Sequence, residues 1–291
     1  MLEIAPNIYY LPGKNKSRFP YCACLYLIGR DLRILIDAGM GEENLAPALT
    51  ADIDVLILSH CHVDHRLTRR LIPEVPVWCH AAEIEYMTSE EKFIEGIGFK
   101  RGGVKASHLI DNVAGFFDMR IERILGDGNE IDLGGLRLVC LHTPGHSPGH
   151  LSFFIPEHHM LFTADVDLTR FGPFYGHDFA NIDDFIFSIR KLKQIKAQVI
   201  ATSHAGPFNS SIQAHLEAYE KIIYKRDQLL LDKLKQPRAL KTFYGSRLIY
   251  RLYPDDDALS KWFELVHIEK HLSRLAGLGK VHEDSGKWVR C

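Results

Sequence analysis

The sequence predicts an α/β protein in which two β-sheets pack together, helices cover them, and a smaller helical module follows. The chain has 291 residues, 46% of them hydrophobic and 25% charged, which is ordinary for a globular protein with a sizeable core. Between residues 1 and 208, a run of short strand-like segments followed by helical periodicity occurs twice in succession. Beyond Phe208 the pattern changes to long helical segments.

The first half of the chain reads as short strands that each end in glycine or a polar residue. Helices are expected over residues 42–50, where Pro47 weakens the pattern, and over 81–96. Residues 87–123 mix aromatic side chains with turn residues, which indicates an insertion lying over the rest of the protein. The expected strands are 7–13, 22–29, 32–39, 54–60 and 75–80.

The second half of this region repeats the order of strands and then a helix. A helix is expected over residues 183–195. We place a domain boundary after Phe208, which predicts a larger domain over residues 1–208 and a smaller C-terminal domain over 209–291. The expected strands are 130–135, 136–143, 150–156, 159–165 and 197–204.

The C-terminal segment predicts a winged-helix-like module. Residues 211–237 have the apolar recurrence of a long amphipathic helix that Pro237 ends. Residues 256–281 read as helix, turn and helix, and 279–290 read as a hairpin around a Ser-Gly turn. Such a module offers a surface for a homodimer. It carries 15 Lys and Arg against 11 Asp and Glu, a modest positive surplus.

Bulk features exclude several classes of protein. The formal net charge of −2 gives no general reason to expect nucleic acid or an anionic membrane as a partner. The six cysteines form no CxxC pair, which indicates reduced thiols and a cytoplasmic protein. The first ten residues lack the basic and apolar regions of a signal peptide, and no run approaches the roughly 18 apolar residues of a membrane span.

The segment LILSHCHVDHRL, at residues 56–67, concentrates three histidines and an aspartate directly after an aliphatic run. Buried imidazoles are costly unless a partner occupies their lone pairs, and a metal ion does so. In an extended chain His60 and His62 point to the same side and can converge on one ion. If the chain then turns, Asp64 and His65 reach a second point nearby, so the segment can hold two metals.

Three further polar residues follow predicted strands. His146 lies in the Pro- and Gly-rich loop LHTPGHSPGH, Asp165 lies at a strand end within LFTADVD, and His204 lies at a strand end within VIATSHAGP. Loops at strand ends are where functional side chains usually lie.

Together these motifs resemble the metallo-β-lactamase superfamily. HxHxDH at residues 60–65, TPGHSPGH, FTAD and SHAGP follow the family's order, with LIDAG upstream, and they span residues 1 to about 207. The resemblance implies a four-layer αββα sandwich with metal ligands on loops at one edge. It implies that Asp37 is a carboxylate that orients a ligand histidine. It further implies a first metal held by His60, His62 and His146, a second held by Asp64, His65 and His204, and Asp165 bridging both.

The implied ligand set is chemically consistent with a hydrolase. Imidazole and carboxylate ligands suit two Zn²⁺ ions, and ligand type alone also admits Fe or Mn. Two such ions generate a hydroxide near neutral pH and polarise the electrophile. We expect metal-bound hydroxide to attack a carbonyl while Asp64 or Asp165 handles the proton.

Three activities remain open. The leading hypothesis is hydrolysis of a small activated acyl compound (a thioester, lactone or related ester), as in the glyoxalase II and lactonase branches that the chain resembles. The second is cleavage of single-stranded RNA, because endoribonucleases of this superfamily carry a C-terminal winged-helix-like domain. The third is a persulfide dioxygenase that uses one iron.

Other residues receive more specific expectations. Tyr175 and His177 lie in a loop that should face the metals, and we expect one of them to contact the substrate. Cys61 should face away from the ions. Three arginines in DHRLTRR should crowd the mouth of the site. An apolar pocket wall is expected from Phe93, Phe99, Phe116 and Phe117, and structural or surface positions from His80, His108, His150, His158 and His159.

Overall fold

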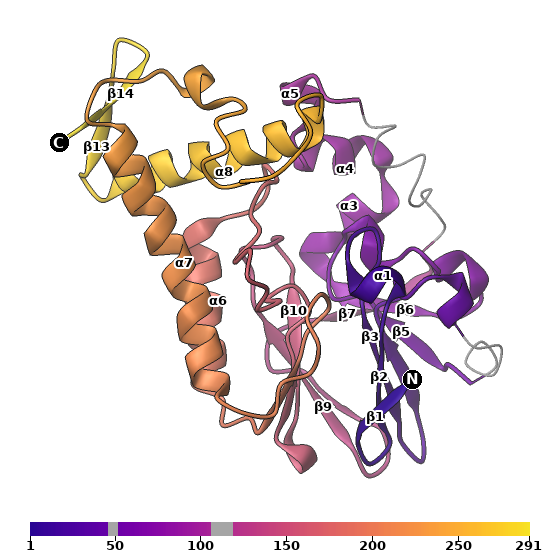
Figure 1. The fold of residues 1–291 in the computed structure, drawn as a ribbon. Coiled ribbons are helices and arrows are strands. Elements are labelled where there is room, and N and C mark those ends of the chain that lie inside the picture. The colour runs from indigo at the N-terminus through magenta and orange to yellow at the C-terminus, as the bar shows by residue number, and fades with distance from the viewer. Residues whose placement is uncertain (46–51, 106–118) are drawn as a thin grey trace.

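The computed structural model describes residues 1–45, 52–105 and 119–291 (Figure 1). Within these ranges the first sheet has seven strands that pair in chain order. The pairs β1–β2, β2–β3 and β3–β4 are antiparallel, whereas the pairs β4–β5, β5–β6 and β6–β7 are parallel. The strands are β1 (Leu2–Ala5), β2 (Ile8–Leu11), β3 (Cys24–Ile28), β4 (Arg33–Ile36), β5 (Val55–Ile57), β6 (Val77–His80) and β7 (Ile121–Leu125).

The second sheet has the order β12-β11-β10-β9-β8 in the described part of the chain. Its first pair, β11 and β12, is parallel, and the other pairs are antiparallel. The strands are β8 (Glu130–Asp132), β9 (Arg137–His142), β10 (Leu151–Ile155), β11 (Met160–Phe162) and β12 (Val199–Ala201).

Alternation of side chains along the strands builds the layers. In β4, Ile34 and Ile36 point into the core between the two sheets, while Leu35 points to the outer face of the first sheet. In β11, Met160 and Phe162 face that same central core, and Leu161 faces outward. Each sheet is therefore apolar on both faces and needs a further layer on its outer side.

Helices supply the two outer layers. α6 and α7 lie side by side on the outer face of the second sheet, and the short helices α3 to α5 lie on the outer face of the first (Figure 1). The result is the expected αββα sandwich. The helices are α1 (Lys14–Ser17), α3 (Ile84–Thr88), α4 (Glu90–Gly96), α5 (Phe99–Gly102), α6 (Ile182–Lys193), α7 (Ile212–Lys233) and α8 (Ala258–Gly277).

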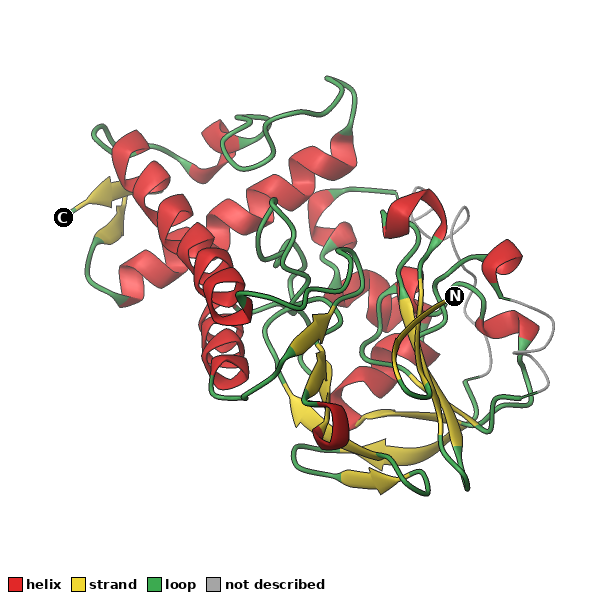
Figure 2. Ribbon diagram, turned by 60° about the horizontal axis from the view of Figure 1, so that its bottom comes forward, coloured by secondary structure: helices red, strands yellow, loops and turns green. Residues whose placement is uncertain are grey.

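The C-terminal segment differs from the expected winged-helix-like module. Within residues 256–281, one continuous helix, α8 (Ala258–Gly277), replaces the expected helix, turn and helix. Its N-terminus is capped by Asp257, which accepts a hydrogen bond from the backbone N–H of Ser260, and no glycine or proline interrupts it before Gly277. The hairpin is present, as β13 (Val281–Asp284) and β14 (Lys287–Arg290), and lies apart from the two large sheets (Figure 2).

Several other expectations need correction. The expected helix over 81–96 is broken at Ser89, whose side chain caps α4, and two strands, β1 and β7, were not predicted. β7 begins at the end of the segment 87–123, which was expected to be an insertion, and continues beyond it. The expected helix over 42–50 is a short 3-10 turn at Glu42–Asn44, and residues 46–50 lie outside the described ranges. Among the described helices, none has the length and apolar character to cross a bilayer.

Candidate metal centre

The residues singled out in the sequence lie where strands end. His60 to His65 follow β5, His146 lies between β9 and β10, and Asp165 and His204 follow β11 and β12. Since β11 and β12 are parallel and β10 is antiparallel to β11, the polar loops of the second sheet meet at one edge. A 3-10 turn at Val63–His65 bends the chain after His62 and brings Asp64 and His65 to that edge.

These side chains form two of the three groups of metal-type donor atoms found within the described residues, the third being Cys22, Asp37 and His65. In each group one donor atom per residue lies within 4.8 Å of the others. The first group is His60, His62, His146 and Asp165, and the second is Asp64, His65 and His204.

Asp165 joins the two groups. Its Oδ2 atom lies 3.1 Å from His146 Nε2 and 3.4 Å from His204 Nε2, while Oδ1 lies 3.0 Å from His65 Nε2. One carboxylate therefore contacts histidines of both groups. The His and Asp cluster is consistent with a binuclear metal site.

The hydrogen bonding and protonation of the buried histidines in the cluster are those expected of metal ligands. His60 Nε2 is buried and has no hydrogen-bond partner among the described residues, which is costly for an imidazole unless an ion takes its lone pair. Burial and the neighbouring histidines hold the pKa of His60 and of His62 well below the ordinary value. Both rings are thus neutral, the form in which histidine binds metal.

A buried pair, Asp37 and Ser59, supports both donor groups. Asp37 Oδ2 accepts from His65 Nδ1 at 2.8 Å and from the Ser59 hydroxyl at 2.8 Å, and Oδ1 accepts from the Ser59 backbone N–H at 2.8 Å. The Ser59 hydroxyl also lies 3.0 Å from His60 Nδ1. The contact expected of Asp37 with a candidate ligand histidine is present. The role of Ser59 was not predicted, because a serine before a histidine is not a recognisable motif.

Glu83 was also missed. This carboxylate is fully buried and accepts hydrogen bonds from the backbone N–H of Cys61 at 2.7 Å, the hydroxyl of Ser147 at 2.7 Å and the backbone N–H of Gly149 at 2.5 Å. Cys61 lies between two candidate ligands, and Ser147 follows another. Glu83 therefore ties the loop after β5 to the loop between β9 and β10.

His150 is structural, as expected. Its Nδ1 contacts the hydroxyl of Thr143 at 2.9 Å, and its Nε2 accepts from the backbone N–H of Asp165 at 3.1 Å. Ala164 has a φ of 42°, in the left-handed region that glycine favours. The backbone before Asp165 is thus held in an unusual conformation.

The two residues expected to contact substrate occupy different positions. Tyr175 is fully buried, and its hydroxyl contacts His271 Nε2 at 2.6 Å and the guanidinium of Arg226 at 2.8 Å. This enclosed position gives it a packing contact with the C-terminal helices and does not support a substrate contact. His177 instead faces a candidate ligand, with Nδ1 2.8 Å from His62 Nε2.

The expected surroundings of the site also change. Of the three arginines, Arg66 and Arg69 are buried and only Arg70 is exposed, where it pairs with Glu42. Phe93 and Phe99 are enclosed in the core under the first sheet, so they form no pocket wall. Phe116, Phe117 and His108 lie outside the described residues.

Other aromatic rings lie beside the cluster. Phe179 stacks on His62 with ring centroids 5.8 Å apart, and Phe263 of α8 lies 5.2 Å from His177. Both phenylalanines are half-buried. Cys61 is buried away from the donors, and burial raises the pKa of its thiol well above the ordinary value, as expected of an unreactive cysteine.

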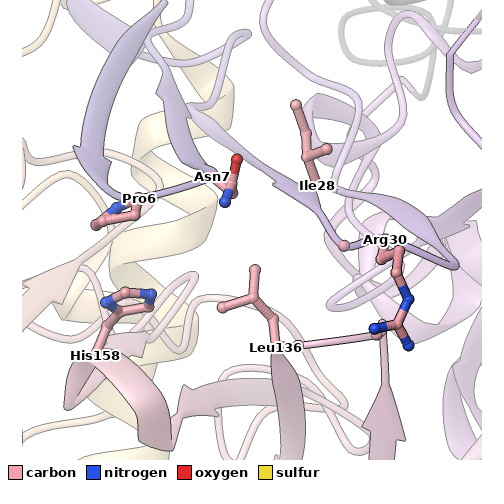
Figure 3. A pocket seen from close by; sticks show the side chains of 9 residues that line it. Pro6, Asn7, Ile28, Arg30, Leu136 and His158 are labelled. Carbon is pink, nitrogen blue, oxygen red and sulfur yellow. The ribbon is translucent and has the colours of Figure 1, made fainter.

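A surface cavity of about 400 Å³ lies far from the His and Asp donor cluster (Figure 3). It is lined by the turns between β1 and β2, β3 and β4, and β8 and β9, together with His158. The turn before β4 lies at the opposite end of the parallel β4 and β5 from His60. The cavity therefore does not belong to the metal centre.

A family model described as the metallo-beta-lactamase superfamily matches residues 18–204, which include the whole donor cluster. The chain belongs to this superfamily. It is a metallo-hydrolase of that fold, with additional C-terminal helices.

Similar proteins agree with this assignment. A metallo-beta-lactamase family protein of Thermus thermophilus has a similar structure, with a TM-score of 0.79, 22% identity, and coverage of 99% of this chain and 100% of that one. An acyl-coenzyme A thioesterase of Gallus gallus is 27% identical over 57% of this chain and 65% of the relative. An atrochrysone carboxyl ACP thioesterase of Pseudocercospora fijiensis is 23% identical over 96% of this chain and 77% of the relative.

Proposed function

We propose that this protein hydrolyses acyl thioesters with the help of two metal ions. The observation that carries the proposal is the contact of one carboxylate, Asp165, with histidines of two separate donor groups. Two divalent ions held at such a site lower the pKa of a bound water toward neutrality and polarise a carbonyl group. Zinc fits the mixed imidazole and carboxylate donors, and iron or manganese are the alternatives.

The proposed ligands divide into two sets. His60, His62 and His146 would hold one ion, and Asp64, His65 and His204 the other, with Asp165 between them. Support for the assignment is the convergence of these atoms and the unpartnered Nε2 of His60. The neutral state of His60 and His62 leaves lone pairs directed into the cluster.

The remaining residues would handle the substrate and the proton. Asp64 and Asp165 are carboxylates at the cluster and are the candidates to accept a proton from the attacking water. Phe179 and Phe263, which lie beside His62 and His177, would contact the acyl group. The small acyl compound is preferred to other substrates because two relatives are named as thioesterases.

The test combines metal analysis with a substrate panel. Protein purified without added metal is analysed by inductively coupled plasma mass spectrometry, beside a His62→Ala variant. We expect close to two ions per chain, reduced in the variant, and release of free thiol from acyl-coenzyme A thioesters of graded chain length.

Other outcomes favour other activities. Hydrolysis of lactones alone would show that the substrate is a lactone, cleaved by the same metal-dependent hydrolysis. Cleavage of single-stranded RNA without thiol release would replace the thioesterase with a nuclease. One iron per chain together with oxygen uptake on a persulfide would indicate the dioxygenase.

A further inference from the structure

The side of His62 that faces away from the cluster contacts another histidine. His62 Nδ1 points into the cluster, where it lies 2.8 Å from His146 Nε2. The other ring nitrogen, Nε2, lies 2.8 Å from His177 Nδ1. His177 is 6% exposed, so this pair is shielded from solvent.

The tautomers of the pair follow from metal binding. A neutral imidazole carries one N–H, so a ring that binds a metal through Nδ1 must carry its proton on Nε2. That N–H needs an acceptor, and His177 Nδ1 lies within hydrogen-bond distance of it. Ligand histidines commonly donate this bond to a carboxylate or a carbonyl, as His65 does to Asp37 here.

The loop that carries His177 is held by the C-terminal helices. Arg226 of α7 donates to the carbonyls of Phe171 and Pro173, each at 2.6 Å. Lys270 of α8 donates to the carbonyls of Asp178 at 3.0 Å and Ala180 at 2.6 Å. His177 is thus flanked on both sides by backbone that these two helices fix.

We propose that His177 is a positioning residue that accepts a hydrogen bond from His62 and orients it toward the metal, and that α7 and α8 serve the metal centre by holding its loop. The inference rests on the ligand assignment proposed above. It gives the C-terminal helices a role in the chemistry that requires neither nucleic acid nor a second copy of the chain.

The test measures metal affinity, not turnover alone. Wild type, His177→Ala and His177→Asn are stripped of metal, and the affinity for Zn²⁺ is measured by competition with a chromophoric chelator. The Asn amide oxygen takes nearly the place of the ring Nδ1 and still accepts. We expect His177→Ala to lower the affinity for one of the two bound ions by about 10- to 100-fold. His177→Asn should restore most of this affinity.

Two further variants and two readouts isolate the positioning role. Absorption of the Co²⁺-loaded proteins should change for the ion near His62 and remain as in wild type for the other. The melting temperature of the metal-free variants should stay near that of wild type, which a purely structural role would not predict. Lys270→Met should give a smaller loss in the same direction, and the exposed His282→Ala should give none.

Each outcome has a definite meaning. If wild type binds two ions and His177→Ala binds both as tightly, the inference is wrong while the metal centre stands. If His177→Asn loses as much as His177→Ala, the acceptor role is wrong. If wild type binds no metal, the ligand assignment itself fails.

Discussion

Asp37 and His65, 28 residues apart in the chain, form a buried hydrogen bond of 2.8 Å between a carboxylate oxygen and a ring nitrogen. The same carboxylate holds the hydroxyl and the backbone N–H of Ser59. Asp37 has a φ of 63°, a left-handed conformation that aspartate tolerates better than most residues. Through Ser59 it reaches His60, so one side chain supports histidines of both donor groups.

We predict that Asp37→Asn weakens binding of the ion near His65 by about 10- to 100-fold. Both carboxylate oxygens accept hydrogen bonds, and an amide replaces one acceptor with a donor. The free energy of unfolding should also fall, by about 1–3 kcal/mol. Chelator competition and urea unfolding measure the two effects. The exposed Asp256→Asn is the control and should change neither.

Glu83→Gln should loosen the connection between two ligand-bearing loops. The carboxylate accepts hydrogen bonds from three donors. In glutamine one of the two oxygens is replaced by an amide nitrogen, which cannot accept, so at least one of these donors loses its partner. We expect a loss of about 1–3 kcal/mol in stability and weaker binding near His146. Glu85→Gln, two residues away and exposed, should match wild type in both measurements. Equal effects of the two substitutions would refute this role for Glu83.

Gly39 of the LIDAG motif should tolerate no side chain. A Cβ atom there would lie 1.7 Å from the backbone oxygen of Asp64 and 2.4 Å from Cys22 Sγ. Gly39→Ala must therefore move the backbone at Asp64, and we expect a loss of at least about 1–3 kcal/mol together with weaker metal binding. Gly277→Ala meets nothing within 4 Å and serves as the matched control in thermal unfolding. If both variants melt alike, the close approach has been misjudged.

Acid should destabilise the protein through His267. Its Nδ1 donates to the Phe263 carbonyl at 2.8 Å and its Nε2 accepts from the Tyr175 N–H at 3.2 Å, so the ring is neutral. Burial, and then nearby Arg226, hold the pKa of His267 well below its ordinary value. Below a pH of about 6.5 the unfolded chain binds a proton that the native ring does not, so the free energy of unfolding falls as the pH falls.

The contribution of His267 can be separated by substitution. One such group contributes a slope of up to about 1.4 kcal/mol per pH unit. His267→Gln keeps an acceptor for Tyr175 but does not titrate. Urea unfolding of both proteins between pH 5 and 7, in the same metal state, should give a shallower slope for the variant. Parallel slopes would show that His267 is protonated in the native state or contributes nothing.

Removal of metal should lower the melting temperature of the protein and leave its secondary structure intact. An ion that binds only the native state stabilises it by about 2.7 kcal/mol at a free concentration 100 times its dissociation constant. Chelated protein should therefore melt at a lower temperature while keeping its far-ultraviolet circular dichroism, because the central core lies between the sheets and involves none of the donors. An unchanged melting temperature after complete removal would contradict the metal assignment.

Part of the site was predictable because its residues belong to short motifs at strand ends. His60, His62 and His65 stand within one hexad, and His146, Asp165 and His204 each follow an apolar strand. The strands themselves were predictable as short apolar runs bounded by turn residues. β7 was missed because three of its five residues are exposed and two of them are charged, so no apolar run marks it.

Glu83 carried no such signal, and although the loop of His177 was expected to face the metals, its contact with His62 was not predicted. Glu83 accepts from residues 22, 64 and 66 positions away, and His177 meets His62 across 115 positions. An acid at the start of a helix and a histidine in a loop are ordinary surface residues in most sequences. Only the folded chain buries them against particular partners.

The sequence by itself indicated two packed sheets covered by helices, because apolar periodicity is a local property of the chain, and the donor set followed from the resemblance of its motifs to the metallo-β-lactamase superfamily. Tertiary structure decided the rest. It joined the two donor groups through Asp165, buried Tyr175 and two arginines, made one helix of residues 258–277, and brought the C-terminal helices to the loop beside His62. These arrangements depend on how distant segments pack, and packing between segments far apart in the chain leaves no pattern within either one.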